Sequence, residues 1–374
     1  MIPALYVHIP FCAKKCAYCD FVSYPGRLNE TDAYISRVLE EARARKREYG
    51  IEGISSLYLG GGTPSLLSAE QLKRLTEGLF TLFPPQTDSE ITLEANPGTL
   101  RPGFLKAARD LGFNRLSLGV QARQDRLLQM LGRIHRFGDA VEAVNDARAS
   151  GFDNISCDVM NELPDQTEKD ITETLTEVIN LGVQHISCYG LILEEGTPLF
   201  QRVSAGELRL PDEEQARRLN LCAADVLEKH GYRRYEISNY ALPGYESRHN
   251  LVYWTGGDYL GLGCAAHSFM KSERFSNPGL DEYMKGTDHT DAYFVDEKGK
   301  LEETILLGTR MARGVDLKAF KARFGDEACE KLVSAAQRMI GLIILFDSQL
   351  CLTAEGFLVH STIAAELVCA VEGE

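Results

Sequence analysis

The amino-acid sequence predicts an α/β fold in two parts. Short apolar runs rich in β-branched residues alternate six times with amphipathic helical patterns over about the first 230 residues. After about residue 300, successive helical patterns surround one apolar hairpin pattern. Regular alternation of strands and helices indicates a parallel sheet, either doubly wound or barrel-like, and the number of units alone does not decide between them. In both cases ligands are expected at the carboxyl ends of the strands.

The first part is predicted from its strands and helices in turn. The six predicted strands are residues 4–9, 55–61, 90–96, 115–120, 154–160 and 185–193. Asn29 is the expected N-cap of the first helix, and Ser68 with Gln71 has the spacing of a capping box at the start of the second. The remaining helices are expected at 101–111, 124–131, 137–150, 167–181 and 211–231.

Beyond the last of these helices the pattern changes twice. Residues 236–300 are rich in Gly, Tyr and Asp, and we expect an irregular connecting region there. Helical patterns follow from residue 302, at 316–324 and at 326–340, and then a predicted hairpin and a last helix. The sequence therefore predicts a core domain at 1–235 and a small, mainly helical C-terminal domain with a β-hairpin at 301–374.

Composition and charge limit the classes of function. The net charge of −14 argues against a nucleic-acid partner, because proteins that grip phosphate backbones are usually basic. No apolar run approaches the roughly 20 residues of a transmembrane helix, and the N-terminus lacks the pattern of a secretory signal. We expect a cytoplasmic protein without a transmembrane segment, in which the ten cysteines remain thiols or bind metal.

Three cysteines lie close together in the run FCAKKCAYCDF. Cys12, Cys16 and Cys19 follow the first predicted strand, and Pro10 before them favours a loop over a helix. A structural zinc site usually has four ligands, and no second cysteine pair follows nearby. Iron–sulfur clusters are held by cysteine thiolates, and three of them would leave one iron open to a substrate or cofactor. The spacing favours such a cluster, with zinc or unliganded thiols as alternatives.

A glycine-rich run and a set of polar residues follow the next predicted strands. The run LGGGTPS at 59–65 comes at the end of the second strand, and glycine lets a backbone approach a ligand without a Cβ in the way. A polar residue near a strand end can simply cap a loop. Several of them together would instead form a polar ring at one end of the sheet. The residues concerned are Glu94, Gln121 and Asp158.

The C-x3-C-x2-C pattern after a strand, in a chain of six βα units, resembles the radical S-adenosylmethionine (SAM) superfamily. The resemblance implies a partial (β/α)6 barrel of the TIM type. It also implies a [4Fe–4S] cluster on Cys12, Cys16 and Cys19, with SAM bound to the fourth iron and cleaved reductively to a 5′-deoxyadenosyl radical. The cofactor contacts that the resemblance implies are Tyr6, Tyr18, Gly61, Gly62, Thr63, Glu94, Gln121, Arg133 and Asp158. Core packing for Tyr6 and a solvated helix end for Arg133 are the plainer alternatives.

The wider sequence resembles oxygen-independent coproporphyrinogen III oxidase and its relatives over nearly the whole chain. The motifs are YVHIPFC, LGGGTPS, RLSLGVQ, LGRIHR, ELPDQT and LEEGTPL. This group has two branches, a decarboxylating oxidase and a heme chaperone. Phe21 stands where the oxidase has a further cysteine, and the cluster motif begins at residue 12, without the N-terminal arm of the oxidase. Both features favour the chaperone branch.

The run HNLVYW at 249–254 matches an H-N-x-x-Y-W motif typical of the heme-chaperone branch. A neutral imidazole is a common ligand of heme iron, and Tyr253 and Trp254 offer apolar faces to a macrocycle. The resemblance therefore implies that His249 binds heme, with Cys264 and His267 as rival ligands. A structural turn with packed aromatic residues is the alternative.

One loop departs from the family pattern. The family usually reads YGLPGQT after the aspartate of strand five, whereas this chain reads NELPDQT at 161–167. Glu162 and Asp165 thus replace glycines, which adopt positive φ at little cost. We expect an altered loop conformation and, through it, an effect on SAM affinity.

Together these features predict a chaperone that binds heme and a SAM-liganded [4Fe–4S] cluster. It would deliver heme to apo-hemoproteins such as respiratory enzymes, acting peripherally at the membrane. No catalytic residue is assigned, and no turnover is required. The alternative is an oxygen-independent coproporphyrinogen III oxidase of porphyrin biosynthesis. A different radical SAM reaction, such as RNA modification, is disfavoured by the acidic net charge.

Overall fold

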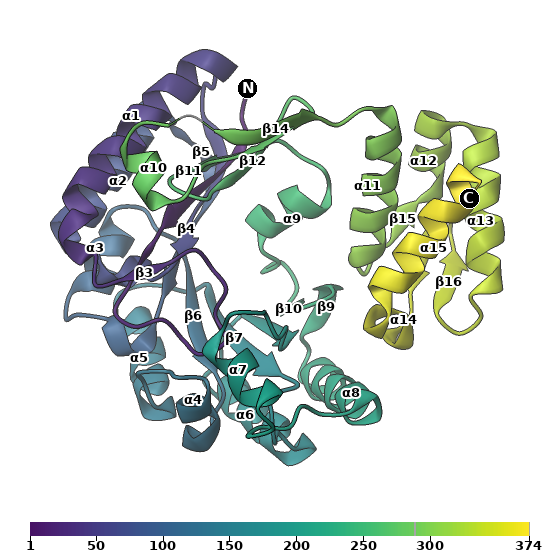
Figure 1. Cartoon of the computed structure of the whole chain (residues 1–374), viewed down its shortest axis with the longest axis horizontal. Helices are drawn as coiled ribbons and strands as arrows, with labels where there is room; N and C mark the ends of the chain where they lie inside the picture. The colour runs from purple at the N-terminus through teal and green to yellow at the C-terminus, as the bar shows by residue number, and fades with distance from the viewer. Residues whose placement is uncertain (288, 374) are drawn as a thin grey trace.

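The computed structural model describes residues 1–287 and 289–373. Within them, one sheet of twelve strands forms the centre of the molecule (Figure 1). Neighbouring strands in the middle of this sheet run parallel, as predicted. In sheet order they are β11 (Tyr259–Leu262), β1 (Ala4–Ile9), β4 (Ile54–Gly61), β5 (Pro85–Ala95), β6 (Arg115–Gln121), β7 (Ile155–Asn161) and β8 (His185–Gly190).

Antiparallel strands extend the sheet at both edges. β8 is followed by β10 (Asn239–Ala241) and β9 (Arg233–Glu236). On the other side, β11 is followed by β12 (His267–Met270), β13 (Glu273–Ser276) and β14 (Thr290–Phe294). In the described part of the chain, the outermost strands β9 and β14 do not pair with each other, so the sheet stays open and is not a closed barrel.

Most helices of the core lie along the outer side of the parallel strands (Figure 1). Up to Lys229, the helices of the chain are α1 (Thr31–Tyr49), α2 (Ala69–Leu82), α3 (Phe104–Asp110), α4 (Asp125–Met130), α5 (Phe137–Ala149), α6 (Glu168–Asn180), α7 (Pro198–Ser204) and α8 (Glu213–Lys229). Among them α7 differs, since its Leu199 donates its N–H to the carbonyl of Ala17, between the cysteines, at 2.8 Å.

The predicted capping box of Ser68 and Gln71 is confirmed. The prediction that Asn29 caps α1 was wrong. A 3₁₀ turn at Leu28–Glu30 leads into α1 instead, and Glu30 is its N-cap residue, without a side-chain hydrogen bond.

Residues 236–300 are not the irregular region that the sequence predicted. They contain α9 (Arg248–Trp254) and α10 (Leu280–Met284), together with β10 to β14. β11 pairs in parallel with β1, with Ala4 opposite Tyr259 and Val7 opposite Leu262. β11 is short and contains a glycine, and its pairing with β1 stabilises it. Because β1 belongs to the N-terminal end of the chain, local periodicity around β11 does not reveal this partner.

The C-terminal helices form a second packing unit beside the sheet, on the right of Figure 1. They are α11 (Glu297–Arg310), α12 (Leu317–Phe324), α13 (Asp326–Arg338), α14 (Ala354–Leu358) and α15 (His360–Glu372). The predicted hairpin is present as β16 (Ile343–Phe346) and β17 (Gln349–Leu352), joined by the short strand β15 (Val315–Asp316). This unit has its own hydrophobic core, which includes Leu332 and Leu367 and is separate from the core around the parallel strands.

No helix of the described residues has the length and apolar character needed to cross a lipid bilayer.

Candidate functional site

The three cysteines lie on a loop at the carboxyl end of β1. Cys12 ends the short strand β2 (Phe11–Cys12), which pairs with β3 (Tyr24–Pro25) and so closes the loop at its base. The backbone N–H of Tyr24 also donates to the carbonyl of Pro10 at 2.7 Å. Cys12 is buried, whereas Cys16 and Cys19 are half-buried, and all three are free thiols.

Neighbouring segments fix this loop and contact two of its sulfurs. The N–H of Ala17 donates to the carbonyl of Leu131 at 2.9 Å. The Thr63 hydroxyl lies 3.4 Å from Cys12 Sγ, and Arg133 Nη1 lies 3.5 Å from Cys16 Sγ. A hydroxyl donor and a guanidinium both favour the thiolate form that a metal centre requires.

The donor set fits an iron–sulfur cluster better than a single metal ion. Among residues 1–287 and 289–373, no three His, Cys, Asp or Glu side chains are gathered closely enough to hold one metal ion. A [4Fe–4S] cluster binds each thiolate through a different iron, so its cysteines need not converge on one point. Three thiols on one short loop match that requirement.

The glycine-rich run packs directly against the cysteine loop. Gly61 has φ +110°, and a Cβ on it would lie 2.5 Å from His8 Nδ1. A Cβ on Gly62 would lie 2.8 Å from the carbonyl oxygen of Phe11 and 3.1 Å from Cys12 Sγ. Both positions therefore require glycine, and the run can approach the cluster loop only because these side chains are missing.

Glu94, near the end of β5, faces the same run. One carboxylate oxygen accepts a hydrogen bond from the Tyr58 hydroxyl at 2.7 Å, and the other accepts from the N–H of Gly61 at 3.0 Å. Burial raises the pKa of the Glu94 carboxyl to about 7. The carboxylate is thus held in one orientation but is only partly ionised near neutral pH.

The remaining predicted SAM contacts lie on β6, β7 and the segment after α4. Asp158 accepts a hydrogen bond from the Ser117 hydroxyl at 3.1 Å, and burial raises its pKa. Gln121 accepts from the Tyr189 hydroxyl at 3.0 Å. Arg133 Nη2 donates to the carbonyl of Gly119 at 2.6 Å, while its Nε is buried and has no hydrogen-bond partner. An unpartnered guanidinium N–H beside the cysteine loop fits an incoming carboxylate.

The two predicted tyrosine contacts lie on β1 and in the cysteine loop. The Tyr6 ring lies 6.2 Å from the ring of Tyr58 on the neighbouring strand. Tyr18 lies within the cysteine loop, and burial raises the pKa of its hydroxyl, while the nearby Arg133 guanidinium opposes that rise. Contact of either side chain with a bound cofactor remains a prediction.

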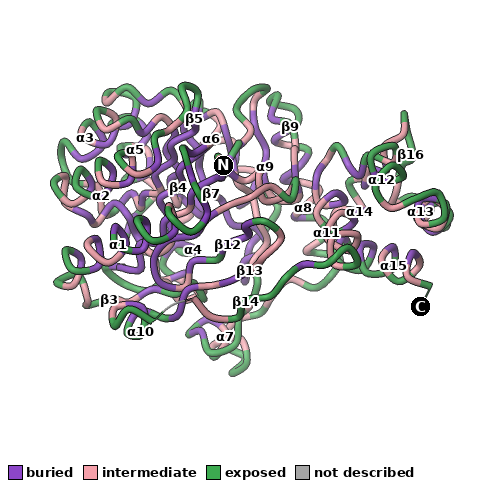
Figure 2. The backbone as a smooth tube through the Cα atoms, turned by 90° about the horizontal axis from the view of Figure 1, so that it is seen from above, coloured by how far each residue is buried: buried purple, intermediate pink, exposed green. Residues whose placement is uncertain are grey.

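Some of the predicted residues lie on the strands of the sheet and are partly reached by solvent. Most residues of the parallel strands are buried, as Figure 2 shows for the centre of the molecule. The exceptions include Tyr6, Tyr58, Glu94, Gly119 and Asp158, each half-buried within its strand. Side-chain contacts join Cys12 to Thr63, Cys16 to Arg133 and Gly61 to Glu94.

Sequence reasoning missed two side chains that support the site. The Tyr58 hydroxyl holds Glu94, as described above. His8 Nε2 lies 2.7 Å from the carbonyl oxygen of Val22 in the cysteine loop, and its Nδ1 lies 3.0 Å from the Tyr6 hydroxyl. The alternation of polar and apolar residues along β1 and β4 could have indicated that these side chains face inward.

His249, the predicted heme ligand, does not reach the surface. It is 1% exposed, and both ring nitrogens have protein partners, Nδ1 with the Ser56 hydroxyl at 2.8 Å and Nε2 with the Tyr253 hydroxyl at 2.7 Å. Burial lowers the pKa of the imidazole to about 3. Of the two rival ligands, Cys264 is buried and His267 is exposed.

The loop that departs from the family pattern adopts the conformation that glycine would favour. Glu162 has φ +59° and Asp165 has φ +56°. The Glu162 carboxylate accepts a hydrogen bond from Asn220 Nδ2 at 2.6 Å and lies over Gly190, where a Cβ would come within 2.3 Å of it. The two acidic residues thus adopt the left-handed backbone that glycine favours, and the predicted effect on SAM affinity remains a prediction.

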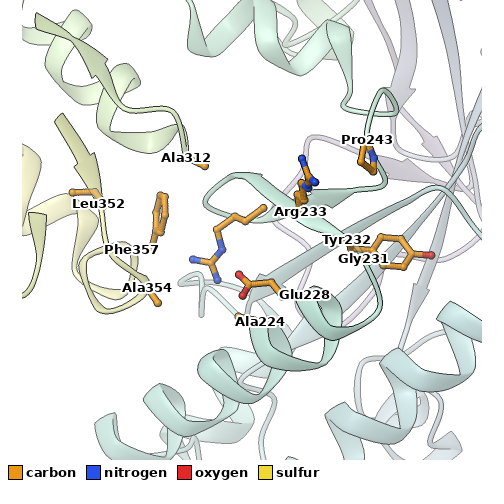
Figure 3. Close-up of a pocket in the computed structure, with 11 residues that line it drawn as sticks. Ala224, Glu228, Gly231, Tyr232, Arg233, Pro243, Ala312, Leu352, Ala354 and Phe357 are labelled. Carbon is orange, nitrogen blue, oxygen red and sulfur yellow. The ribbon is translucent and has the colours of Figure 1, made fainter. Parts of the chain in front are cut away.

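A pocket of about 650 Å³ lies away from this site, between the core and the C-terminal unit. Figure 3 shows Glu228 and Tyr232 of the core on one side and Leu352, Ala354 and Phe357 on the other. Among the described residues that line it there is no histidine, cysteine or methionine, and its tyrosine, Tyr232, donates its hydroxyl to the carbonyl of Val183 at 2.5 Å.

Comparison with known proteins identifies the family of this chain. Residues 6–178 match the radical SAM superfamily, and residues 295–359 match the HemN C-terminal domain. The chain is 36% identical to the heme chaperone HemW of Bacillus subtilis (strain 168) over 367 residues, which cover 96% of this chain and 97% of that protein. The chain belongs to the HemW family. The HemW of Escherichia coli (strain K12) is 38% identical over 271 residues, 71% of this chain and 69% of that protein.

A solved structure agrees with the fold of this HemW-family chain. Coproporphyrinogen III oxidase (HemN) from Escherichia coli, a radical SAM enzyme, superposes with a TM-score of 0.83 at 23% identity, covering 98% of this chain and 90% of that one. The predicted fold class, a radical SAM core with a helical C-terminal region, is therefore confirmed, although the sheet is open.

Proposed function

We propose that this protein is a heme chaperone that carries a SAM-liganded [4Fe–4S] cluster and passes heme to apo-hemoproteins. The observation that carries the proposal is the near full-length similarity to a heme chaperone HemW, over 96% of this chain. Respiratory enzymes at the membrane are the proposed clients, and the cytoplasm, with peripheral contact to the membrane, is the proposed location.

The cluster would be held by Cys12, Cys16 and Cys19, with SAM between the glycine-rich run and the ends of β5 to β7. When bound, the two groups would supply reductive cleavage of SAM. The chain's own part is to orient them. Arg133 offers its unpartnered Nε to a carboxylate, and Glu94 and Asp158 offer acceptors to amino or hydroxyl groups.

The heme ligand is proposed from three candidates. His249 would have to leave Ser56 and Tyr253 before it could bind iron, which breaks two hydrogen bonds inside the protein. Cys264 is fully buried, and burial raises the pKa of its thiol to about 12. His267, at the start of β12, is exposed and needs no such rearrangement. His249 remains the ligand that the family motif implies, and His267 is the accessible one.

The test is an anaerobic heme titration of the reconstituted protein, followed by the visible absorbance of heme. Wild type, His249→Ala and His267→Ala are compared, and coproporphyrinogen III is supplied in a parallel reaction. Heme binding without porphyrin products supports the chaperone. Loss of the heme spectrum in one variant assigns the ligand to that residue.

The opposite result has a clear meaning. If wild type with an intact cluster binds no heme but converts coproporphyrinogen III, the protein is an oxidase of porphyrin biosynthesis. Phe21, which occupies the position of the oxidase's further cysteine, would then have been a misleading signal.

A further inference from the structure

We infer that helix α9, which carries the HNLVYW motif, supports the SAM site: His249 positions Tyr58, and Tyr58 positions Glu94. This inference rests on the proposed function, because it takes Glu94 as a SAM contact. It assigns a role to two side chains that lie beside the cofactor site without belonging to the cluster ligands.

The first link is the hydrogen bond from the Tyr58 hydroxyl to Glu94, at 2.7 Å. Within the protein, each Glu94 oxygen has one donor, Tyr58 on one side and the N–H of Gly61 on the other. Without the hydroxyl, the carboxylate keeps one donor and can rotate about its terminal torsion, which has only broad energy wells. A carboxylate that must meet SAM in one orientation then loses that preorganisation.

The second link is the packing of His249 on Tyr58. The ring centroids lie 5.1 Å apart with an interplanar angle of 30°. The imidazole cannot turn freely, because Ser56 Oγ and the Tyr253 hydroxyl hold its two nitrogens. Ser56 and Tyr58 are two residues apart on β4 and face the same side. His249 therefore fixes the lateral position of the Tyr58 ring.

The third link ties α9 to the strand that carries Glu94. The buried carboxylate of Glu90, on the same face of β5 as Glu94, accepts from the N–H of Arg248 at 3.1 Å and from the N–H of His249 at 3.0 Å. It also accepts from the Ser247 hydroxyl at 3.3 Å. Both strands of the site, β4 and β5, are thus bonded to the start of one helix.

The experiment measures SAM affinity calorimetrically in anaerobically reconstituted full-length protein. Tyr58→Phe removes only the hydroxyl, and a hydrogen bond to a charged group contributes enough that SAM binding should weaken about 10- to 100-fold. Iron content should not change, because Tyr58 does not contact a cysteine sulfur. Tyr232→Phe is the matched control, since its buried hydroxyl bonds to the carbonyl of Val183 far from the site; SAM affinity should stay at the wild-type value.

A double-mutant cycle separates positioning from general damage. In a Glu94→Ala background, Tyr58→Phe should have less than a twofold further effect, because no acceptor for the Tyr58 hydroxyl remains at that side chain. The electron paramagnetic resonance spectrum of the reduced cluster should respond less to added SAM in Tyr58→Phe than in wild type. Unchanged affinity in Tyr58→Phe, or fully additive losses in the cycle, would overturn the inference.

His249→Ala distinguishes this inference from the proposed function. Weakened SAM binding with heme binding retained supports a positioning role for His249. Loss of heme with SAM affinity unchanged overturns that role and leaves the heme chaperone standing. If wild type binds heme but no SAM, the inference fails and only the SAM part of the proposed function fails with it.

Discussion

Glu94 is the residue whose chemistry depends most on its surroundings. Burial raises the pKa of its carboxyl from the ordinary 4.5 to about 7, so both protonation states are populated near neutral pH. In protein without SAM, the same shift means that the contribution of Glu94 to stability falls as pH rises from its ordinary pKa through about 7. Ligand binding has the opposite dependence, because only the ionised carboxylate accepts from both oxygens.

We predict that SAM affinity rises with pH through the titration of Glu94. If the ionised form binds, a pKa of about 7 gives roughly tenfold tighter binding at pH 8 than at pH 6. Calorimetric titration of the reconstituted protein across this range measures the change. The Glu94→Gln variant serves as the reference, since it retains the titration of SAM itself but not that of the carboxyl group. Equal slopes in both proteins would contradict the prediction.

For individual residues, the sequence indicated candidate site residues by their position near the ends of predicted strands. Glu94, Asp158 and Gly62 lie in or next to predicted strands, and the family resemblance predicted their contact with SAM. Tyr58 and His8 were not predicted, because their roles depend on which strands are neighbours in the sheet. Register between strands is a tertiary property, and one chain segment read alone does not contain it.

At the scale of the elements, the loop after β7 contains two residues in an unfavourable backbone conformation. Glu162 and Asp165 both have positive φ, a conformation that costs a non-glycine residue about 1–2 kcal/mol. Glu162 gains a hydrogen bond from Asn220. Asp165 is exposed, and its carbonyl, not its side chain, accepts from Arg126.

We therefore predict that Asp165→Gly stabilises the protein by about 0.5–1 kcal/mol, the relief of left-handed strain less the entropy of glycine in the unfolded chain. Urea denaturation of the protein without cofactors measures the free energy of unfolding. Glu162→Gly is the comparison, because it relieves the same strain but loses the bond to Asn220, so it should gain less. A loss of stability in Asp165→Gly would show that its side chain stabilises the loop.

The short length of the elements explains why residues 236–300 were predicted to be irregular. Strong local patterns, such as the capping box of Ser68 and Gln71, predicted most helices of the core, whereas the short helix α7 was missed. α9 and β11 to β13 are seven residues or fewer in length. Elements this short are stabilised by tertiary contacts such as those of Glu90 and β1, and their own propensity is too weak to identify them.

At the scale of the whole molecule, the ion pairs that join the core to the C-terminal unit differ widely in their surroundings. Arg310 Nε lies 3.1 Å from a carboxylate oxygen of Glu236, which is fully buried, and the guanidinium also lies 4.2 Å from the ring of Trp254. Arg217 Nε donates to Glu355 at 3.0 Å, with both side chains at least 40% exposed. Figure 1 shows α9, which carries Trp254, between the sheet and the C-terminal helices.

We predict that Arg310→Met destabilises the protein by about 3 kcal/mol, because it leaves a buried carboxylate without its cation. Arg217→Met should cost at most about 1 kcal/mol, as expected for an exposed pair. Urea unfolding followed by fluorescence reports directly on this junction, since Trp254 is the only tryptophan. Similar losses in the two variants would mean that burial does not set the strength of these contacts.

The sequence predicted that a second unit exists, from its helical patterns and its hairpin, but not how that unit is attached. The attachment depends on Glu236, Arg310 and Trp254, which lie on three separate elements and have no shared local pattern. The backbone bridge between Glu236 and Met311 likewise joins an edge strand to the end of α11. The limits of the C-terminal domain at 301–374 remain a prediction.

The pairing of β1 with β11 also has a consequence for biosynthesis. β1 leads into the cysteine loop, yet its second sheet neighbour, Tyr259–Leu262, is translated long after it. At about 5–20 residues per second, the ribosome adds that neighbour roughly 10 to 50 s later. Until then the strand beneath the cysteines has one open edge. A nascent chain that acquired its metal centre early would hold the centre on a loop whose strand, β1, still lacks its neighbour β11. We therefore expect the metal centre to be inserted after most of the chain has been synthesised.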